Sequence, residues 1–140
     1  MIISRKMKNE DTKEVLEIIE KGLYSNSNSD VIYIIKDNNE INGVCGISSY
    51  NDFGTLDYII IKEKFRGKDL GDGLIRATFN YCLRKGLLQI YFLGYSEYLL
   101  KKGFMETNEE KIDFNVSNST KNNKILICDL PDFFSKKCCK

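Results

Sequence analysis

Hydrophobic residues gather in short runs that polar turns separate. The run Val31–Ile35 is rich in β-branched residues, and the polar turn 37–40 joins it to a second run, Ile41–Ile47. Two such runs around a short polar turn are typical of a β-hairpin. A further turn at 51–54 leads to the run Leu56–Ile61, which extends the hairpin into an antiparallel meander. Strands are predicted at 2–7, 31–35, 41–47, 56–61, 87–93, 112–116 and 125–130.

Two longer stretches carry apolar residues at helical spacing. In the first, Asp11 is the predicted N-cap, and Glu14 is spaced to complete a capping box before the apolar stripe of 15–23. In the second, apolar residues recur through 74–83, and Gly86 is the predicted C′ residue. Both stretches are therefore predicted to be helices that bury one face.

A short third helix is predicted at 97–102, with Ser96 as its N-cap and Gly103 at its end. The order of elements is then β-α-β-β-β-α-β-α-β-β. It predicts the α/β (α+β) class, with a mixed central β-sheet and helices on both faces. At 140 residues and without an obvious linker, the chain is expected to form one domain over residues 1–130, followed by a C-terminal tail at 131–140.

The turn at 66–73, between the strand 56–61 and the long helix, has the chemistry of an anion site. It contains Gly67, Gly71 and Gly73, and glycine lets a ligand approach the backbone closely. The unpaired N–H groups and the dipole of a helix N-terminus both favour a phosphate. We interpret this turn as a cradle for the pyrophosphate of a nucleotide cofactor.

Composition narrows the classes of function. Apolar residues make up 42% of the chain and charged residues 29%, with a net charge of +1, which argues against a nucleic-acid binder. No apolar run approaches the roughly 20 residues of a membrane span, and the first residues show no signal sequence. A cytoplasmic protein without nucleic-acid or membrane partners is expected. Histidine is absent, which excludes Ser-His-Asp catalysis and His-ligated zinc, and no metal site is predicted.

The five cysteines are predicted to be reduced, because their number is odd and no secretory signal precedes them. Cys45, Cys82 and Cys128 lie within apolar patterns and are expected in the core. The adjacent Cys138 and Cys139 are interpreted as exposed thiols of the tail, with a redox or metal-binding role as the alternative.

Two motifs resemble the GCN5-related N-acetyltransferase (GNAT) family. The stretch 68–73 (KDLGDG), preceded by Arg66 and Gly67, resembles the family's cofactor signature Arg/Gln-x-x-Gly-x-Gly/Ala. The stretch 95–104 (YSEYLLKKGF) resembles its second landmark, a short helix that ends in Gly-Phe. The predicted order of elements is also similar to that of the family up to about Leu130.

This resemblance implies that the protein binds acetyl-CoA as a co-substrate and transfers its acetyl group to an amine by direct attack. The strands before and after the turn would splay apart, with the pantetheine arm in the gap and the pyrophosphate on the N–H groups of the turn. Arg66 and Lys68 would add charge-assisted contacts. The residues implied in cofactor binding are Ile59, Ile60, Ile61, Arg66, Gly67, Lys68, Asp69, Leu70, Gly71, Asp72 and Gly73.

The catalytic groups are less fixed by the resemblance. Many members place a tyrosine four residues before the glycine of Gly-Phe, where it protonates the departing thiolate, but here that residue is Leu99. Tyr95 and Tyr98 are the nearby candidates, and the alternative is that both are packing aromatics and water supplies the proton. Asp57, on the strand before the turn, is the candidate base, with a solvated surface acid as the alternative.

Asp69 and Asp72 also depart from the family pattern, because carboxylates repel a pyrophosphate. With Leu99, they leave open a second function, a CoA- or acyl-CoA-binding module or sensor with little or no turnover. A third is a small interaction domain with a nonfunctional loop. The expected acceptor is a small-molecule amine or a protein amine, bound by the loops 24–30 and 117–123. The expected assembly is a monomer or a homodimer.

Overall fold

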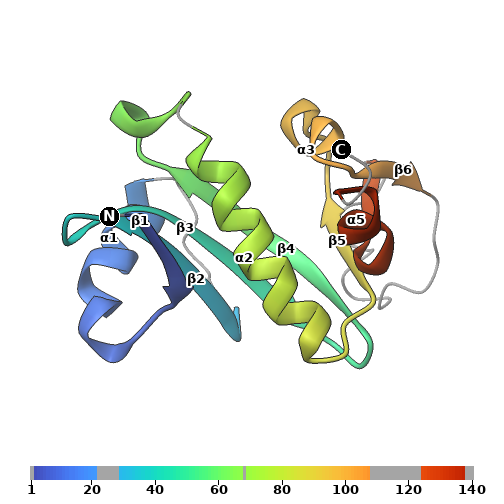
Figure 1. Cartoon of the computed structure of the whole chain (residues 1–140), viewed down its shortest axis with the longest axis horizontal. Helices are drawn as coiled ribbons and strands as arrows, with labels where there is room; N and C mark the ends of the chain where they lie inside the picture. Colours follow the sequence, from blue (N-terminus) through green and yellow to red (C-terminus); the bar gives the residue numbers. More distant parts are fainter. Residues whose placement is uncertain (1, 22–28, 68, 108–123, 138–140) are drawn as a thin grey trace.

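A seven-stranded mixed sheet forms the centre of the computed structural model, which describes residues 2–21, 29–67, 69–107 and 124–137 (Figure 1). The strand order is β1-β2-β3-β4-β5-β7-β6. Neighbouring strands pair antiparallel except β4 and β5, which are parallel. The strands are β1 Ile2–Lys6, β2 Val31–Asp37, β3 Glu40–Ser49, β4 Phe53–Ile61, β5 Gln89–Leu93, β6 Met105–Thr107 and β7 Ile125–Asp129. The helices are α1 Thr12–Lys21, α2 Leu70–Arg84, α3 Glu97–Lys101 and α5 Leu130–Lys137, with 3-10 turns η1 Asn9–Asp11 and η2 Glu63–Phe65.

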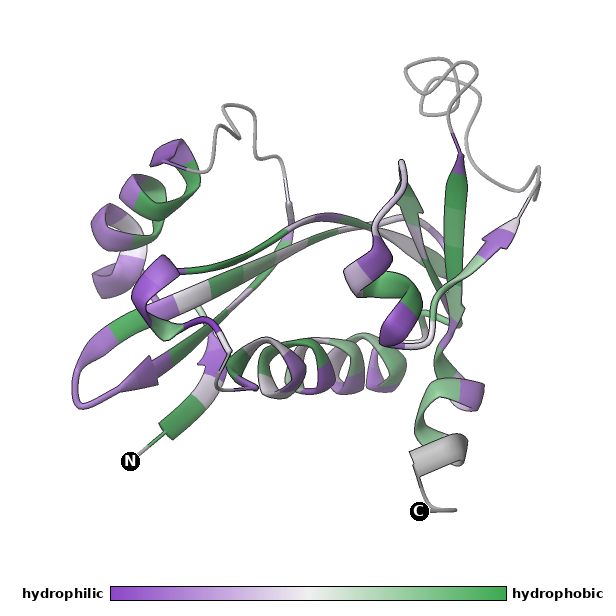
Figure 2. Cartoon of the chain, turned by 90° about the horizontal axis from the view of Figure 1, so that it is seen from above, coloured by the Kyte–Doolittle hydropathy of each residue, from purple (hydrophilic) through white to green (hydrophobic). Residues whose placement is uncertain are grey.

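Helices cover both faces of the sheet, as predicted (Figure 2). On one face, α1 buries Val15, Ile18 and Ile19 against residues of β2, β3 and β4. On the other face, α2 runs across the sheet and buries its apolar stripe, including Leu74 and Phe79, in the larger core cluster. The mixed sheet and the helices on its two faces confirm the predicted fold class.

The predicted end of α2 is confirmed by its backbone hydrogen bonds. Gly86, at φ 97°, donates its N–H to the Leu83 carbonyl at 3.0 Å, and Leu87 donates to the Cys82 carbonyl at 3.0 Å. This pair of bonds is the Schellman motif, in which a left-handed C′ residue satisfies the last carbonyls of a helix.

The short helix α3 begins and ends as the Gly-Phe motif predicts. The Ser96 hydroxyl accepts a hydrogen bond from the Leu99 N–H at 3.2 Å. At the other end, Gly103 has φ 113°, and Phe104 donates its N–H back to the Leu99 carbonyl at 3.0 Å. The motif is therefore a capped helix whose final turn buries Phe104 in the core.

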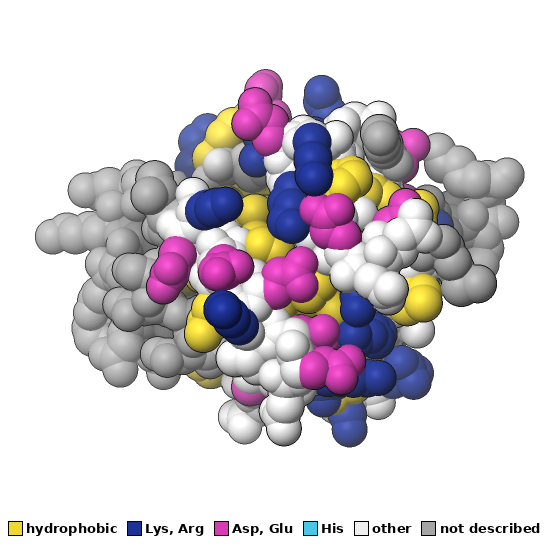
Figure 3. Space-filling model, turned by 90° about the vertical axis from the view of Figure 1, so that its left-hand side faces the viewer, with side chains coloured by type: hydrophobic (Ala, Val, Ile, Leu, Met, Phe, Trp, Pro, Cys, Tyr) yellow, Lys and Arg dark blue, Asp and Glu magenta, His cyan; other side chains and the backbone are white. Residues whose placement is uncertain are grey.

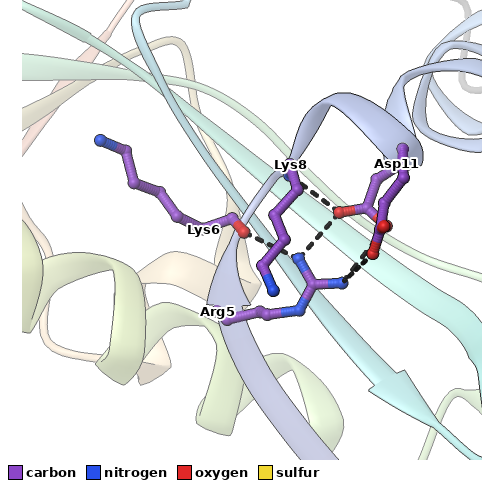
Figure 4. Close-up of polar contacts among 5 residues, drawn as sticks. Arg5, Lys6, Lys8 and Asp11 are labelled. Atoms are coloured by element: carbon purple, nitrogen blue, oxygen red, sulfur yellow. Dashed lines mark hydrogen bonds and ion pairs between the residues drawn. The ribbon is translucent and has the colours of Figure 1, made fainter.

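The predicted N-cap of α1 is wrong. Asp11 is the last residue of η1, and its buried carboxylate accepts hydrogen bonds from the Lys8 N–H at 2.8 Å and from the Arg5 guanidinium at 2.8 and 3.3 Å (Figure 4). Glu14 does not reach back to complete a capping box; instead it accepts the Ile41 N–H of β3 at 3.2 Å. Asp11 instead holds the third position of the turn that begins after Lys8, where its carboxylate accepts the backbone N–H of the N-cap residue Lys8.

The C-terminal region differs from the prediction in its elements. β6 forms at 105–107, directly after α3, and pairs antiparallel with β7; the strand predicted at 112–116 lies outside the described residues. The last strand ends at Asp129, and α5, which was not predicted, begins at Leu130. Phe133 of α5 packs against Phe79 of α2, with ring centroids 5.5 Å apart.

Candidate functional site

A β-bulge at Asp57 opens the sheet at the centre of the molecule. Tyr58 pairs with Gly46 of β3 and Leu56 pairs with Ile47, so Asp57 is the extra residue between them. Leu56 accordingly packs in the α2-side cluster and Tyr58 in the α1-side cluster, although residues two apart share a face in a regular strand. A bulge bends its strand and increases the local twist.

The consequence is a split between the two parallel strands. β4 pairs with β5 only from Phe53 to Thr55, whereas β4 itself continues to Ile61. Figure 1 shows the two strands diverging toward the edge of the molecule where η2 and α3 lie. The backbone of 59–61 thus has β3 on one side and no β5 partner on the other.

A cleft of about 640 Å³ occupies this split. Its walls come from the end of β4, from the turn and first turn of α2, from β5 and from α3. The lining residues are Tyr58, Ile59, Ile60, Ile61, Phe65, Arg66, Gly67, Asp69, Leu70, Gly71, Asp72, Phe92, Ser96, Tyr98, Leu99 and Lys102. The structure therefore brings together most of the residues that the sequence assigned to the cofactor, while Gly73 lies outside the lining and Lys68 outside the described residues.

The turn presents its backbone to the cleft. Gly67 at φ 83° and Asp69 at φ 61° both have left-handed backbone conformations. The first regular bond of α2 runs from the Gly73 N–H to the Asp69 carbonyl at 3.3 Å, so the N–H groups of residues 70–72 precede the intrahelical pattern. Donors of this kind at a helix N-terminus suit an anion.

The two glycines of the signature differ in what they require. A Cβ placed on Gly71 would lie 2.2 Å from the Tyr98 hydroxyl oxygen, whereas a Cβ on Gly73 would meet only Ile35 Cδ1, at 3.8 Å. A side chain at Gly71 would therefore have to displace the Tyr98 phenol, whereas the position of Gly73 has room for alanine.

Three of the charged residues of the cleft, Arg66, Asp72 and Lys102, already contact other groups of the protein. The Arg66 Nε donates to the Ile61 carbonyl at 2.9 Å, which holds the guanidinium beside the end of β4. Lys102, the C-cap residue of α3, lies 3.5 Å from the Asp72 carboxylate. Asp69 is exposed and makes no side-chain bond to the end of α2. Lys102 was missed from the sequence, because nothing in its spacing indicates that α3 brings it to the first turn of α2.

The two candidate tyrosines lie in different surroundings. Tyr98 lines the cleft and is 41% exposed; partial desolvation of its phenol, followed by the charge of Asp72, raises the pKa of the phenol above the ordinary value. Tyr95 is 52% exposed, lies outside the lining and packs under the Lys124 ammonium, 5.3 Å from the ring centroid. Leu99, at the position of the family tyrosine, is 1% exposed.

Asp57 is surrounded by hydroxyl groups. Its carboxylate accepts hydrogen bonds from Ser29, from Ser48 at 2.5 Å and from Thr55 at 3.3 Å. It is partly buried at the bulge but does not line the 640 Å³ cleft. Ser29 and Ser48 were missed from the sequence, since only the sheet brings them to Asp57. Ser48 lies on β3, which pairs with β4, and Ser29 comes shortly before β2, which pairs with β3.

Cysteine chemistry does not reach the site in the described part of the chain. Cys45 and Cys82 are fully buried free thiols, and burial raises the pKa of each to about 12. A thiol that stays protonated is a poor nucleophile. Cys138 and Cys139 lie outside the described residues. Within the part of the chain that the structure describes, no group of three or more potential metal ligands is found. The same part contains no helix long and apolar enough to cross a membrane.

Known structures share this fold at low sequence identity. N-acetylglutamate synthase from Neisseria gonorrhoeae, solved with coenzyme A and N-acetyl-glutamate, has a TM-score of 0.78 and 14% identity over 93% of this chain. This chain spans only about a third, 35%, of that protein. The ribosomal-protein-S18-alanine N-acetyltransferase from Escherichia coli has a TM-score of 0.68 and 11% identity, covering 93% of this chain and 94% of that one.

PaiA N-acetyltransferase from Thermoplasma acidophilum, solved with coenzyme A, has a TM-score of 0.69 and 13% identity, covering 92% of this chain and 99% of that one. No curated protein sequence matches the chain significantly. The family model of the acetyltransferase (GNAT) family, however, matches residues 4–99, more than half of the chain. Together with the sheet, the split strands and the glycine turn, this match shows that the chain belongs to the GNAT acetyltransferase family.

Proposed function

We propose that the protein is an acetyl-CoA-dependent N-acetyltransferase that acetylates a primary amine. The observation that carries the proposal is the cleft at the β4–β5 split, which has backbone donors of α2 at one end and a protonated phenol, Tyr98, in its wall. The sequence motifs and the family match support the same conclusion.

The residues of the cleft fit coenzyme A in their chemistry. The N–H groups of 70–72, with Gly67, would hold the pyrophosphate, and each bond to a charged acceptor is worth roughly 1.5–3 kcal/mol. The backbone of 59–61, which lacks a β5 partner, would pair with the amides of the pantetheine arm as an added strand does. Arg66, held against the Ile61 carbonyl, would add a charge near the phosphates.

In the proposed reaction, the amine nitrogen attacks the thioester carbonyl carbon, a C–N bond forms, and the C–S bond breaks. Acetyl-CoA supplies the activated acyl group, and CoA leaves as a thiolate that must gain a proton. Tyr98 is the proposed donor, because its raised pKa keeps the phenol protonated at neutral pH. Tyr95 is the less favoured candidate, since it lies outside the cleft lining.

Asp57 is the proposed base on the acceptor side. The Ser29 and Ser48 hydroxyls donate to its carboxylate, so their oxygen lone pairs are left to accept hydrogens from an ammonium group. A proton could then pass to the carboxylate through one hydroxyl. The acceptor itself stays open between a small-molecule amine and a protein amine, since the loops expected to bind it, 24–30 and 117–123, lie largely outside the described residues.

A panel of amines with acetyl-CoA, monitored by release of free CoA thiol, tests the proposal. Amine-dependent thiol release by the wild type is the expected result. Binding of CoA without turnover with any amine would instead support the alternative, a CoA-binding module, which Leu99 at the usual tyrosine position favours. A ligand at 100 times its Kd stabilises the fold by ~2.7 kcal/mol, so absence of any CoA-dependent thermal shift would contradict both functions.

A further inference from the structure

We propose that Lys102 is a cationic contact for the cofactor diphosphate. In the free protein the Lys102 ammonium pairs with Asp72 in the cleft, and in the complex the diphosphate replaces Asp72 as its partner. This inference rests on the proposed function and names one residue that its binding step requires. Lys102 lies within the second sequence motif, 95–104, but was not assigned to the cofactor, and it follows α3 rather than belonging to the glycine turn.

Two contacts join the α3 segment to the first turn of α2, and a third places Lys102 beside Tyr98 within that segment. The Lys102 ammonium lies 3.5 Å from the Asp72 carboxylate and 5.5 Å from the centroid of the Tyr98 ring. The Tyr98 hydroxyl in turn lies over Gly71. Lys102, Tyr98 and Asp72 all line the cleft, and Asp72 belongs to the turn of α2 whose N–H groups are assigned to the phosphates.

The ion pair is loose enough to be exchanged. The Lys102 and Asp72 side chains keep 26% and 31% of their exposure, and the separation of 3.5 Å is a single contact. A pair of this kind adds little stability, because water competes for both groups. A diphosphate offers the ammonium more negative charge than one carboxylate does, and a flexible lysine can follow it without moving the helix.

The exchange also explains how the turn tolerates its acidic residues. Asp69 and Asp72 match the positive charges of Arg66 and Lys68 within the turn, so the turn has no net positive charge of its own to offer a phosphate. Lys102 adds a positive charge from outside the turn, which offsets Asp72 in the free protein and the phosphates in the complex. If the pair were purely structural, it would act only as a clasp, a contact that joins α3 to α2, and loss of either partner would have the same effect.

Isothermal titration of CoA into four full-length proteins separates these roles. They are the wild type, Lys102→Met, Asp72→Asn and, as a control of equal charge change, Lys101→Met on the exposed side of the same helix. Lys102→Met should weaken CoA binding about tenfold, in line with loss of one charge-assisted hydrogen bond. Lys101→Met should change it less than twofold. Asp72→Asn should tighten it, because the lysine is released and a repulsive charge is removed.

Pantetheine, which has no diphosphate, should bind Lys102→Met and the wild type equally. Weaker CoA binding in both Lys102→Met and Asp72→Asn would overturn the inference, because it is the result expected for a clasp. Equal CoA affinity of Lys102→Met and Lys101→Met, with wild-type binding intact, would overturn the inference alone. Failure of the wild type to bind CoA would overturn the proposed function and this assignment with it.

Discussion

Two carboxylate–cation pairs in this molecule have opposite designs. Asp11 is 4% exposed, and its two oxygens accept from the Arg5 guanidinium and from the Lys8 N–H. Asp72 keeps about a third of its side chain exposed and meets Lys102 at one distance of 3.5 Å. The first pair joins β1 to the start of α1 and leaves no place for a ligand. The second lies in a cleft where a ligand anion can replace the carboxylate.

The difference follows from satisfaction of charge. A buried carboxylate must have its acceptors filled, because an unpaired buried charge costs several kcal/mol. An exposed carboxylate can lack an ion-pair partner at little cost in free energy, because water solvates it. Exposed pairs like that of Asp72 also lie on the outer face of η2 and α1. There Lys62 and Lys64 share Glu40, and basic and acidic side chains are interspersed (Figure 3). Water reaches such pairs, and the face that they form carries both signs of charge.

The largest expected effect is on ligand binding. Gly71→Leu should weaken CoA binding at least a hundredfold, or ~2.7 kcal/mol, because its side chain would enter the space between the turn and Tyr98. Titration of CoA measures the loss, and circular dichroism should show an intact fold. Gly73→Ala is the matched control and should bind CoA normally, since its Cβ meets nothing closer than 3.8 Å. Normal CoA affinity in Gly71→Leu would remove the turn from the binding site.

The buried pair of Asp11 and Arg5, called the fixed pair below, should affect stability and leave CoA binding unchanged. Asp11→Ala should lower the free energy of unfolding by about 2–3 kcal/mol, because it leaves Arg5 and the Lys8 N–H without their acceptor. Urea denaturation measures this loss, and the CoA affinity of the folded variant should not change. Glu10→Ala is the control, because Glu10 is 70% exposed and its carboxylate comes no closer than 4.0 Å to the same guanidinium. Equal stability of the two variants would show that the Asp11 network adds nothing.

Acid should weaken the fixed pair in a defined direction. The hydrogen bond from Arg5, together with that from the Lys8 N–H, lowers the pKa of Asp11 below its ordinary value despite burial. A carboxyl with a lowered folded-state pKa contributes stability above its unfolded pKa, near 4, and loses that contribution as the pH falls through the folded value. The stability advantage of the wild type over Asp11→Asn should therefore be complete at pH 7 and shrink below about pH 4. An advantage that grows with acid would reverse the assigned sign.

The smallest expected effect concerns the phenol that lies between the two helices. Tyr98→Phe should lower the turnover rate about tenfold or less, because water can protonate the thiolate in its absence. Steady-state thiol release measures the change, and Tyr95→Phe, whose ring lies outside the cleft lining, should have wild-type activity. A loss beyond ~10⁴-fold in Tyr98→Phe would mean that the phenol is far more important than a single acid usually is.

Local sequence predicted the elements of this protein well where the signal is a property of neighbouring residues. The alternation of apolar runs and polar turns indicated the meander, and Gly86, Ser96 and Gly103 marked helix ends that the backbone bonds confirm. The role of Asp11 as an N-cap was wrong, because the helical turn begins earlier, with Lys8 as its N-cap, and Asp11 also binds Arg5 of β1. The glycine turn could be identified for the same local reason as the helix ends.

The sequence by itself determined the class of fold, the turn with its backbone donors and the family. Each depends on residue types at fixed short spacing. Only the tertiary structure decided that Asp57 is a bulge, that Tyr98 rather than Tyr95 faces the cleft, and that Lys102 meets Asp72. These outcomes depend on strand register and on the packing of α3 against α2. One residue of slip in a strand, or one step of about 100° around a helix, changes which side chain enters the site.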